Sequence, residues 1–421
     1  MIDISFIREN PSIFKQAVKD KGFEVNIDRI LQLDVTLREN TKIIDDMRSE
    51  RNCMSKLIPG SKDTDRETLT EQVRLLKTEL TAHEASFRDL RKEFDNLMLH
   101  VPSIPAPEVP LGKAEEDNLE LRRVGTVREF DFPFKDHVEL CELHNMLDVP
   151  RATKIAGSRS YFLKNAAVVL EMAISRFVID FLVARGFTPM SVPHLVKENA
   201  MRGTGYFPIG RDQAYSIEED ELFLIGTSEV SLVSYHEDEI LPITDFPIKY
   251  TGISPSYRRE AGTYGRDTRG LYRVHQFQKV EQVIFCEADE QKGEALHYEL
   301  LANAEGILQA LELPYRVCLA CTGEIGIGQT RKHEIEAWMP SRGAYCETHS
   351  CSTLGDFQAR RLGIRYRDVD GEMKYAFTLN NTGIASPRIL IPLLENHQNA
   401  DGSINIPKAL RPYMGLDKIV I

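Results

Sequence analysis

The amino-acid sequence predicts an α+β protein, in which an antiparallel sheet with flanking helices follows an N-terminal antiparallel two-helix coiled-coil arm. Three observations predict this fold class. Two apolar seams lie on either side of Pro59-Gly60-Ser61, four prolines fall between residues 102 and 110, and short strand-like segments follow residue 161 with few helices between them. Strands that cluster without crossover helices indicate antiparallel pairing.

The arm is predicted by apolar residues that alternate at intervals of three and four, the spacing of a coiled coil. The first seam comprises Ile30, Leu33, Leu37, Ile44, Met47, Met54 and Ile58, and the second comprises Leu69, Val73, Leu76, Leu80, His83, Phe87, Leu90, Phe94 and Leu97. The other positions are densely polar, which favours an arm in solvent over the wall of a helical bundle. We expect the arm at residues 27–100, within an N-terminal domain at 1–105.

The second domain is expected at residues 106–421, after a proline-rich segment that predicts a stiff linker. The sequence LKNAAVVLEMAISRFVIDFLVARG predicts a long helix ending at Gly186, and Pro193 restricts the next strand to a sheet edge or an interface. A last helix is expected to begin near Pro387. No GxxxxGK[ST] or GxGxxG phosphate loop is present, so a nucleotide site would have to be built from side chains on the sheet.

Composition excludes some classes of protein. No apolar run reaches the roughly 18 residues needed to cross a bilayer, and the acid-bearing N-terminus matches no secretory or transit peptide. The seven cysteines are odd in number and scattered, which predicts reduced thiols and a cytoplasmic protein. Cys318 and Cys321 form a lone CxxC, so a zinc site is not expected. The formal net charge of −12 does not by itself suggest a nucleic-acid partner.

The segment Ser256–Glu281 departs from this acidic balance. It carries six Lys/Arg against three Asp/Glu, a local excess of three positive charges, around several glycines. We expect a β-hairpin whose arginines hold a polyanion, because the planar fork of arginine suits phosphate and carboxylate. A solvated charged loop is the plainer alternative.

Strand period two predicts which side chains share a face of the sheet. The pairs are Arg258 with Glu260, Thr227 with Glu229, and Asn380 with Thr382, and Phe277, Lys279 and Glu281 form a further set. Such groups could bind a nucleotide through Arg258, Glu260 and Phe277. A polar, anionic pocket for an ammonium and a hydroxyl could form from Thr227, Glu229, Glu281 and Thr382.

Two later segments add candidates for phosphate and metal binding. Glu347 lies three residues before Ser350, and both supply oxygen donors that could hold Mg²⁺ on phosphates. Arg388 is expected in the first turn of the helix that starts near Pro387, where proline is tolerated and the helix dipole is positive.

These segments resemble the three signature motifs of class II aminoacyl-tRNA synthetases, and specifically the bacterial and eukaryotic type of seryl-tRNA synthetase. Motif 1 resembles RFVIDFLVARGFTPMSVPHLV (about 176–196), motif 2 lies within 251–285 and includes YRREAGTYGRDTRGLYRVHQFQKVE, and motif 3 is TLNNTGIASPRILIPLLENHQ (about 378–398). GTSEV, ETHSCSTLGDFQARR and the N-terminal MIDISFIRENP match as well. The resemblance covers essentially the whole chain.

The resemblance implies an ATP-dependent serine–tRNA ligase that forms seryl-adenylate and transfers serine to the 3′ end of tRNA(Ser), and of tRNA(Sec) where that is present. Arg258, Glu260 and Arg388 would be catalytic: Arg258 on the α-phosphate and the serine carboxylate, Glu260 near the adenine amino group, Arg388 on the γ-phosphate. The implied ATP-binding set is Arg258, Arg259, Glu260, Val274, Phe277, Glu347, Thr348, His349, Ser350 and Arg388. The implied serine-binding set is Thr227, Glu229, Arg258, Glu281, Asn380 and Thr382. Glu347 and Ser350 would hold Mg²⁺.

The implied partners are tRNA(Ser), gripped by the arm and by the motif 2 loop, ATP, L-serine and a second copy of the chain bound through motif 1. The loop tip, Thr263–Arg269, would meet the acceptor end of the tRNA. No membrane partner is expected. From residue 27 to 100 the arm carries 13 Lys/Arg and 15 Asp/Glu, a net of −2, so recognition needs its basic residues on one face or must rest on RNA shape.

Some positions depart from the family pattern, and two alternatives stay open. Thr382 stands where many relatives have serine, Tyr257 replaces a frequent phenylalanine, and Pro392 is expected to kink the motif 3 helix at a cost of about 3 kcal/mol. One alternative is a synthetase-like enzyme that charges a carrier protein, although such relatives typically lose the arm. The other is a non-catalytic RNA-binding paralogue, which should have lost Arg258, Glu260, Glu347 or Arg388.

Overall fold

The computed structural model describes residues 1–263, 265 and 269–421. The chain divides into two compact units, Met1–Pro102 and Ser103–Ile421. In the part of the chain that the structure describes, no helix is both long and apolar enough to cross a membrane.

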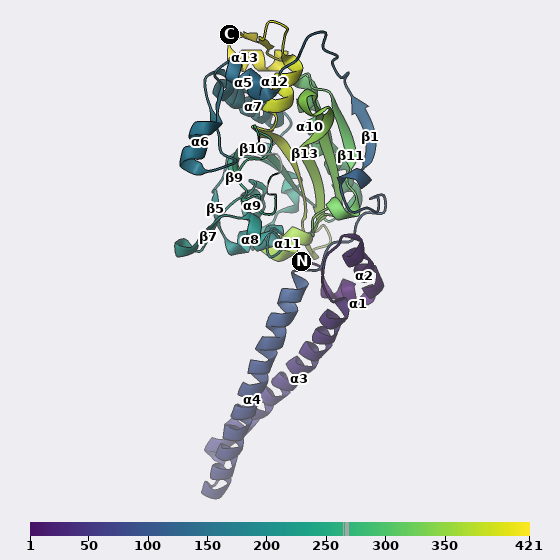
Figure 1. The fold of residues 1–421 in the computed structure, drawn as a ribbon. Coiled ribbons are helices and arrows are strands. Elements are labelled where there is room, and N and C mark those ends of the chain that lie inside the picture. Colours follow the sequence, from purple (N-terminus) through teal and green to yellow (C-terminus); the bar gives the residue numbers. More distant parts are fainter. Residues whose placement is uncertain (264, 266–268) are drawn as a thin grey trace. The chain divides into compact units, whose positions relative to one another are not determined.

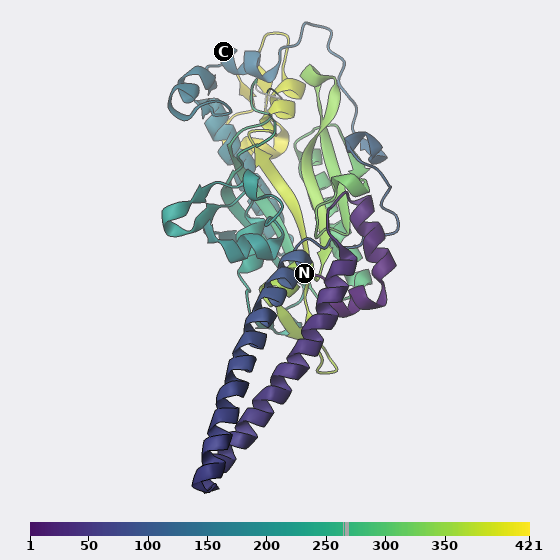
Figure 2. The ribbon, with the colours of Figure 1, turned by 60° about the horizontal axis from the view of Figure 1, so that its bottom comes forward.

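The first unit is helical throughout. Two short helices, α1 (Ile4–Glu9) and α2 (Pro11–Asp20), precede the long helices α3 (Ile27–Leu57) and α4 (Asp63–Met98). A single 3-10 turn, Ile58–Gly60, separates the long pair, which confirms the predicted break. Figure 2 shows α3 and α4 running alongside each other within this unit. The predicted two-helix arm is therefore confirmed.

The seam between α3 and α4 is the buried part of the arm. Ile30, Leu33, Leu37, Ile44 and Leu80 are each less than 10% exposed. Two ion pairs join the helices across the seam, from Arg29 to Glu93 and from Arg48 to Glu84, each with a closest N–O distance of 2.7 Å. His83 lies beside the seam and is half-buried, in keeping with a packing role.

The second unit is built on one large sheet, shown in Figure 1. Its eight strands lie in the order β1-β11-β12-β13-β16-β10-β9-β4, and all neighbours are antiparallel except β4 and β9. The bounds are β1 Leu119–Val124, β4 Thr188–Ser191, β9 Ile248–Tyr257, β10 Gln276–Cys286, β11 Tyr315–Leu319, β12 Arg331–Met339, β13 Ala344–Gly355 and β16 Phe377–Ser386. The mostly antiparallel sheet is confirmed, with the strand before Pro193 at its edge.

Smaller strands form the remaining ladders of this unit. They are β2 Leu147–Asp148, β3 Phe162–Leu163, β5 Leu195–Lys197, β6 Ser216–Ile217, β7 Leu222–Leu224, β8 Ile240–Leu241, β14 Arg365–Arg367, β15 Met373–Tyr375, β17 Ile404–Asn405 and β18 Lys418–Ile419. The helices are α5 His137–Leu143, α6 Val149–Ala156, α7 Ala166–Val183, α8 Glu198–Thr204, α9 Glu229–Ser234, α10 Glu290–Ala310, α11 Phe357–Leu362, α12 Leu390–His397 and α13 Arg411–Met414.

The two faces of the large sheet have different coverings. Helices α7 and α10 pack on one face, where Val280 and Ile284 of β10 join their apolar core. Helices α8, α9 and α11 cover part of the opposite face through a second core that includes Val283 and Phe285. Period two along β10 thus sends alternate residues to opposite cores, and leaves part of the second face for polar side chains.

The proline-rich segment after residue 102 differs from the predicted stiff linker. Its backbone is hydrogen-bonded to the second unit, with the Ser103 N–H donating to Ile327 O and the Ala106 N–H to Thr330 O, both at 2.8 Å. Val109 packs in a small apolar cluster with Leu319 and Ile325. These bonds attach the segment to the second unit, to which residues from Ser103 onward belong.

The basic segment also differs from its prediction. Strand β9 ends at Tyr257 and β10 begins at Gln276, so Arg258, Arg259, Arg269 and Arg273 lie in the connecting loop and not on the strands. Within the loop, Glu260, Gly262, Gly265 and Gly270 all have positive φ, a conformation that cannot continue a strand. Tyr264, Arg266, Asp267 and Thr268 of the predicted tip fall outside the described residues.

Pro392 does not interrupt the motif 3 helix, which corrects a third expectation. Helix α12 begins at Leu390, so Pro392 is its third residue. The first N–H groups of a helix have no acceptor within it, so a proline costs little there. The predicted kink would require a helix that started several residues earlier.

A buried histidine pair behind the sheet predicts acid sensitivity. His297 of α10 and His333 of β12 approach to 2.7 Å between Nε2 and Nδ1. Burial, then the charge of Arg331, lowers the pKa of His333 to about 4, and burial and the neighbouring His333 and Arg331 lower the pKa of His297 well below its usual value. A depressed histidine pKa adds stability above about pH 6.5, which is lost as the pH falls towards the folded value.

We therefore expect the free energy of unfolding to fall between pH 6.5 and 5, with a slope that approaches about 1.4 kcal/mol per pH unit for each histidine towards pH 5. Chemical denaturation at both pH values tests this. The variant His333→Gln should show a shallower slope, because one titrating group is gone. An equal slope in the variant and the wild type would contradict the assignment.

Candidate active site

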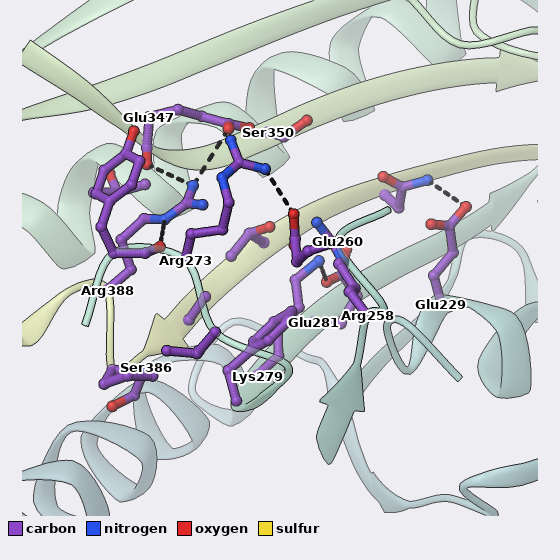
Figure 3. A pocket seen from close by; sticks show the side chains of 18 of the residues that line it. Glu229, Arg258, Glu260, Arg273, Lys279, Glu281, Glu347, Ser350, Ser386 and Arg388 are labelled. Atoms are coloured by element: carbon purple, nitrogen blue, oxygen red, sulfur yellow. Dashed lines mark hydrogen bonds and ion pairs between the residues drawn. The ribbon is translucent and has the colours of Figure 1, made fainter. Parts of the chain in front are cut away.

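A polar cavity of about 300 Å³ opens on the second face of the sheet. Strands β10, β13 and β16 form its floor, and the loop between β9 and β10 forms one wall (Figure 3). Most predicted site residues line it: Glu229, Arg258, Glu260, Val274, Phe277, Glu281, Glu347, Thr348, Ser350, Asn380, Thr382 and Arg388. Residues from five separate segments of the sequence thus meet in one place.

Strand β10 contributes three side chains to the floor. Phe277, Lys279 and Glu281 all line the cavity, as period two predicts. Lys279 Nζ forms an ion pair with Glu281 Oε2, and it also donates to Thr227 Oγ1 at 3.3 Å. Lys279 and Glu281 are both nearly inaccessible, so the pair gives this end of the cavity a fixed arrangement of charge.

Arg258 and Glu260 reach the cavity by a different route from the one predicted. Neither residue is on a strand, because β9 ends at Tyr257. The Arg258 N–H donates to His275 O at 2.9 Å, and its guanidinium lies 5.2 Å from the ring centroid of Phe277. Glu260, held at φ 52°, accepts from Arg273 Nη1 at 2.7 Å. The loop backbone, and not strand period two, brings this pair together.

Arg388 lies at the opposite end of the cavity. It precedes α12 by two residues, outside the first helical turn where it was expected. Its Nη1 donates to Glu347 O at 3.1 Å and lies 3.4 Å from Glu347 Oε2, and its Nε donates to Tyr272 O at 3.1 Å. These contacts hold the positively charged guanidinium of Arg388 at the wall of the cavity, as Figure 3 shows.

Glu347 has the donor chemistry of a Mg²⁺ ligand. Burial would raise the pKa of its carboxyl, but Arg388, Lys332, Arg258 and Lys279 outweigh that effect and lower it. An ionised carboxylate and the Ser350 hydroxyl therefore both line the cavity. Among described residues, no group of three or more His, Cys, Asp or Glu could hold a metal alone. Mg²⁺ is commonly bound by one or two carboxylates together with substrate phosphates, so the residues present fit.

Glu229 is the centre of a buried hydrogen-bond network. Its Oε1 accepts from Asn380 Nδ2 at 2.9 Å and from Gln358 Nε2 at 2.8 Å, and its Oε2 accepts from Tyr206 OH at 3.2 Å. Burial raises the pKa of Glu229 to about 7, helped by Glu281, while Gln358, Lys279 and Tyr206 oppose the rise. A carboxyl group with a perturbed pKa in a cavity is a mark of a functional site.

The predicted strand pairing of Thr227 with Glu229 is wrong. Strand β7 ends at Leu224, and Glu229 is the first residue of helix α9. Thr227 is buried and does not line the cavity, but its Oγ1 donates to Glu281 Oε2 at 3.2 Å. Both residues still reach the same end of the site, because the turn before α9 brings them to the face of β10 that carries Glu281.

Two further predicted residues do not line the cavity. Arg259 is exposed, and its backbone N–H donates to Gln213 O at 2.9 Å. His349 is buried on the other side of β13, where Nε2 is 2.9 Å from Gly383 O. Burial lowers the pKa of His349 to about 4. Its Nδ1 is 2.9 Å from Thr348 Oγ1, so the ring contacts a residue of the cavity without lining the cavity itself.

Comparisons with known proteins agree with this geometry. A family described as the seryl-tRNA synthetase N-terminal domain matches residues 1–105, and one described as the class II tRNA synthetase core domain (G, H, P, S and T) matches residues 214–397. A serine–tRNA ligase of Deinococcus radiodurans is 49% identical over 415 residues, which cover 99% of this chain and 98% of the relative. The chain belongs to the seryl-tRNA synthetase family.

Other seryl-tRNA synthetases are similar over their full length. A serine–tRNA ligase of Dictyoglomus turgidum is 43% identical over 423 residues, with 100% of this chain and 99% of the relative covered. The crystal structure of seryl-tRNA synthetase from Pyrococcus horikoshii complexed with ATP superposes with a TM-score of 0.92 at 38% identity, covering 100% of this chain and 99% of that one. The class II synthetase fold predicted from the motifs is confirmed.

Sequence reasoning missed several residues of this synthetase cavity. Lys279 shares a face with Phe277 and Glu281, so period two could have placed it in the site. Arg273 lies in the motif 2 loop, whose path was unknown. Tyr206 and Gln358, which contact Glu229, come from helical regions with no polar signature of their own. Their roles depend on packing against Glu229, which is 23 residues from Tyr206 and 129 residues from Gln358 in the sequence.

Proposed function

We propose that this chain is a serine–tRNA ligase, which activates L-serine with ATP and transfers the seryl group to the 3′ end of tRNA. The observation that carries the proposal is a single cavity that brings the guanidinium groups of Arg258 and Arg388 together with the buried carboxyl groups of Glu229 and Glu281. Arg258 and Arg388 suit phosphates, while Glu229 and Glu281 suit an ammonium and a hydroxyl. Full-length relatives named serine–tRNA ligases support the same assignment.

In the first step the serine carboxylate attacks the α-phosphate of ATP and displaces pyrophosphate. Arg258 would bind the α-phosphate and the serine carboxylate, and Phe277, beneath its guanidinium, would stack on the adenine. Glu260 would accept from the adenine amino group, the backbone at Val274 would contact the base, and Arg388 would bind the γ-phosphate. Such groups act by positioning and by charge stabilisation, since the step needs little covalent work from the protein.

Glu347 and Ser350 would hold Mg²⁺, with Thr348 beside them in the ATP site. When bound, the ion would neutralise phosphate charge. The coordinating oxygens from the protein lie on β13, at the edge of the cavity that Arg388 occupies. No zinc is proposed.

Selection of serine follows from the buried end of the cavity. The serine hydroxyl would be bound by Glu281 and Thr382, and its ammonium by Glu229, with Thr227 and Asn380 completing the pocket. A site that hydrogen-bonds a hydroxyl rejects alanine, because bound alanine would leave the buried polar groups of the site without hydrogen-bond partners. If Glu281→Ala retained wild-type serine-dependent pyrophosphate exchange, this role of Glu281 would be wrong.

The pKa of Glu229 predicts how serine binding depends on pH. With a pKa of about 7, the carboxylate is lost as the pH falls through that value, and a neutral acid attracts an ammonium less. We expect KM for serine to rise several-fold, up to about tenfold per pH unit, below pH 7, whereas KM for ATP changes less. Pyrophosphate exchange from pH 6 to 8.5 measures both. Glu229→Gln should raise KM for serine and remove its pH dependence; a serine KM in the wild type that is flat over this range would refute the role.

We further propose that the domain limits expected from the sequence apply, with a tRNA-binding domain at 1–105 and a catalytic domain at 106–421. The arm and the motif 2 loop would bind tRNA(Ser), and tRNA(Sec) where it exists. Motif 1, which includes the C-terminal part of α7, would form a homodimer in which the tRNA held by one subunit reaches the active site of the other. The protein would work in the cytoplasm.

The proposed activity is tested by amino-acid-dependent exchange of pyrophosphate into ATP, with each standard amino acid supplied in turn. Serine should support exchange, and alanine and threonine should support it far more weakly. Exchange with a different amino acid would exclude the assignment. Activation of serine without transfer to any tRNA would favour the carrier-charging alternative.

A further inference from the structure

His137 connects the motif 3 helix to the wall of the nucleotide site. It is the first residue of α5 and is buried. Its N–H and its Nδ1 both donate to Glu395 Oε1, at 3.0 and 2.9 Å. Glu395 lies on α12 with no exposed surface, and it also accepts from the N–H and the Oγ of Ser341, at 2.9 and 2.8 Å. Four donors from two segments therefore fix this carboxylate.

The carboxylate determines which nitrogen of His137 carries the proton. Because Nδ1 donates to Glu395, the Nε2 atom of a neutral ring has a free lone pair. The Leu271 N–H donates to that lone pair at 3.3 Å. Leu271 is buried in the motif 2 loop, where an N–H without an acceptor would be costly. The histidine thus supplies an acceptor that only one of its tautomers offers.

The neighbouring glycine shows how closely the loop approaches the ring. A Cβ atom on Gly270 would lie 2.1 Å from His137 Nε2, and the residue adopts φ 78°. Any side chain would therefore clash with the imidazole as well as strain the backbone. Next to it, Arg269 forms an ion pair with Asp136, the N-cap residue of α5. The start of α5 holds the loop at two successive points.

The segment that His137 holds is part of the cavity. Leu271, Tyr272, Arg273 and Val274 all line it. Tyr272 O accepts from Arg388 Nε, and Arg273 donates to Glu260. Leu271, which contacts His137, is therefore followed directly by the residue bonded to Arg388 and then by the residue bonded to Glu260. Both Arg388 and Glu260 are proposed to bind ATP.

We propose that His137, oriented by Glu395, is a positioning residue for the nucleotide: it fixes residues 271–274 as a preformed wall of the ATP site before ATP arrives. The proposal rests on the proposed function only in taking ATP as the ligand. Preorganised groups bind without the cost of ordering them, so loss of the contact should weaken ATP binding and leave the serine pocket, built on other segments, largely unchanged.

A matched control separates positioning from ordinary stability. His144, the C-cap residue of the same helix, also contacts the backbone through Nε2, in its case an oxygen, Gly402 O, at 2.8 Å, and it does not line the cavity. We compare His137→Phe with His144→Phe, both of which replace an imidazole by a ring without hydrogen-bonding groups. Each is expected to lower the melting temperature.

Their ligand binding should differ. For His137→Phe we expect KM for ATP in pyrophosphate exchange, and Kd for ATP by calorimetry without serine, to rise about tenfold, the effect of losing one buried hydrogen bond. KM for serine should stay within about twofold. His144→Phe should leave all three within about twofold. Equal ATP constants in wild type and His137→Phe, or equal losses in both variants, would overturn the proposal. Absence of serine-dependent exchange in the wild type would instead refute the proposed function.

The tautomer provides a test that needs no variant to be active. In wild-type protein labelled with ¹⁵N-histidine, the His137 ring should show a protonated Nδ1 and an unprotonated Nε2 near pH 8. Comparison with His137→Phe identifies the ring signals of His137. If that variant does not fold, correlations that link the ring to the assigned backbone of His137 identify them instead. A protonated Nε2 would exclude the bond from the Leu271 N–H, and with it the proposal.

Discussion

Replacement of Arg258 by alanine is expected to lower kcat/KM for serine-dependent pyrophosphate exchange by about a thousandfold. The reason is its position. Its guanidinium lies over Phe277 and lines the same cavity as the buried Lys279 and Glu281. In such a buried site, a positive charge stabilises the negative charge that develops on phosphate more strongly than it would in water. Loss of one such preorganised group typically costs about 100- to 1,000-fold, and Arg258 is proposed to contact both substrates.

The adjacent arginine is the natural control. Arg259 is exposed and does not line the cavity, although the family resemblance assigned both arginines to ATP. Arg259→Ala should keep exchange within a few-fold of wild type. Arg258→Lys should recover only a fraction of the activity, because an ammonium cannot form two parallel bonds to phosphate. If Arg258→Ala and Arg259→Ala lost similar activity, the cavity would not be the site of ATP activation.

Removal of the arm is expected to separate the two half-reactions. A variant in which a short Gly-Ser linker replaces residues 30–98 should retain serine-dependent exchange, because every residue that lines the cavity belongs to the second unit. Aminoacylation of a tRNA(Ser) transcript should fall by at least about a hundredfold, since protein–RNA affinity depends largely on contacts to phosphate and RNA shape. Both assays run on the same preparation.

Salt dependence then shows how an arm of net charge −2 binds RNA. If basic residues on one face of the intact arm contact RNA phosphates, the affinity for tRNA should fall steeply as the salt concentration is raised. An affinity indifferent to salt would favour recognition of RNA shape. Full aminoacylation by the armless variant would contradict an essential role of the arm in tRNA binding.

The helices and strands whose residues follow a periodic pattern could be predicted from the sequence. The seams of α3 and α4 follow a fixed spacing, so the arm and its break at Pro59 were correct. Period two placed Phe277 and Glu281, and likewise Asn380 and Thr382, on the face that lines the cavity. In these elements, local hydrogen bonding and burial of one face act on the same residues, so pattern and structure agree.

The positions that failed depend on where a strand or helix ends. Arg258 and Glu260 follow β9, Glu229 begins α9, and Arg388 precedes α12; each was assigned to a neighbouring element. Turn residues such as Glu260, with its positive φ, are stabilised by contacts that the sequence does not show. One such contact, from Arg273 to Glu260, joins two residues of the same loop, whose path the sequence does not show.

The buried residues that hold the site residues in place could not be predicted from the sequence, again because their contacts form only in the folded chain. Gln358 holds Glu229, and Glu395 orients His137, yet each lies in a helix whose pattern predicts only packing. Their polar atoms are satisfied by partners about 130 and 260 residues away. The family motifs contained Gln358 and Glu395 but did not indicate what either contacts.

Aminoacylation by the full-length chain tests the central claim most directly. Purified protein, ATP, Mg²⁺ and labelled serine are incubated with a tRNA(Ser) transcript, and the tRNA is then digested to release its terminal nucleoside. We predict serine joined through a base-labile ester to the 3′-terminal adenosine. Charging with another amino acid, or serine activation without any esterified tRNA, would contradict the assignment of this chain as a serine–tRNA ligase.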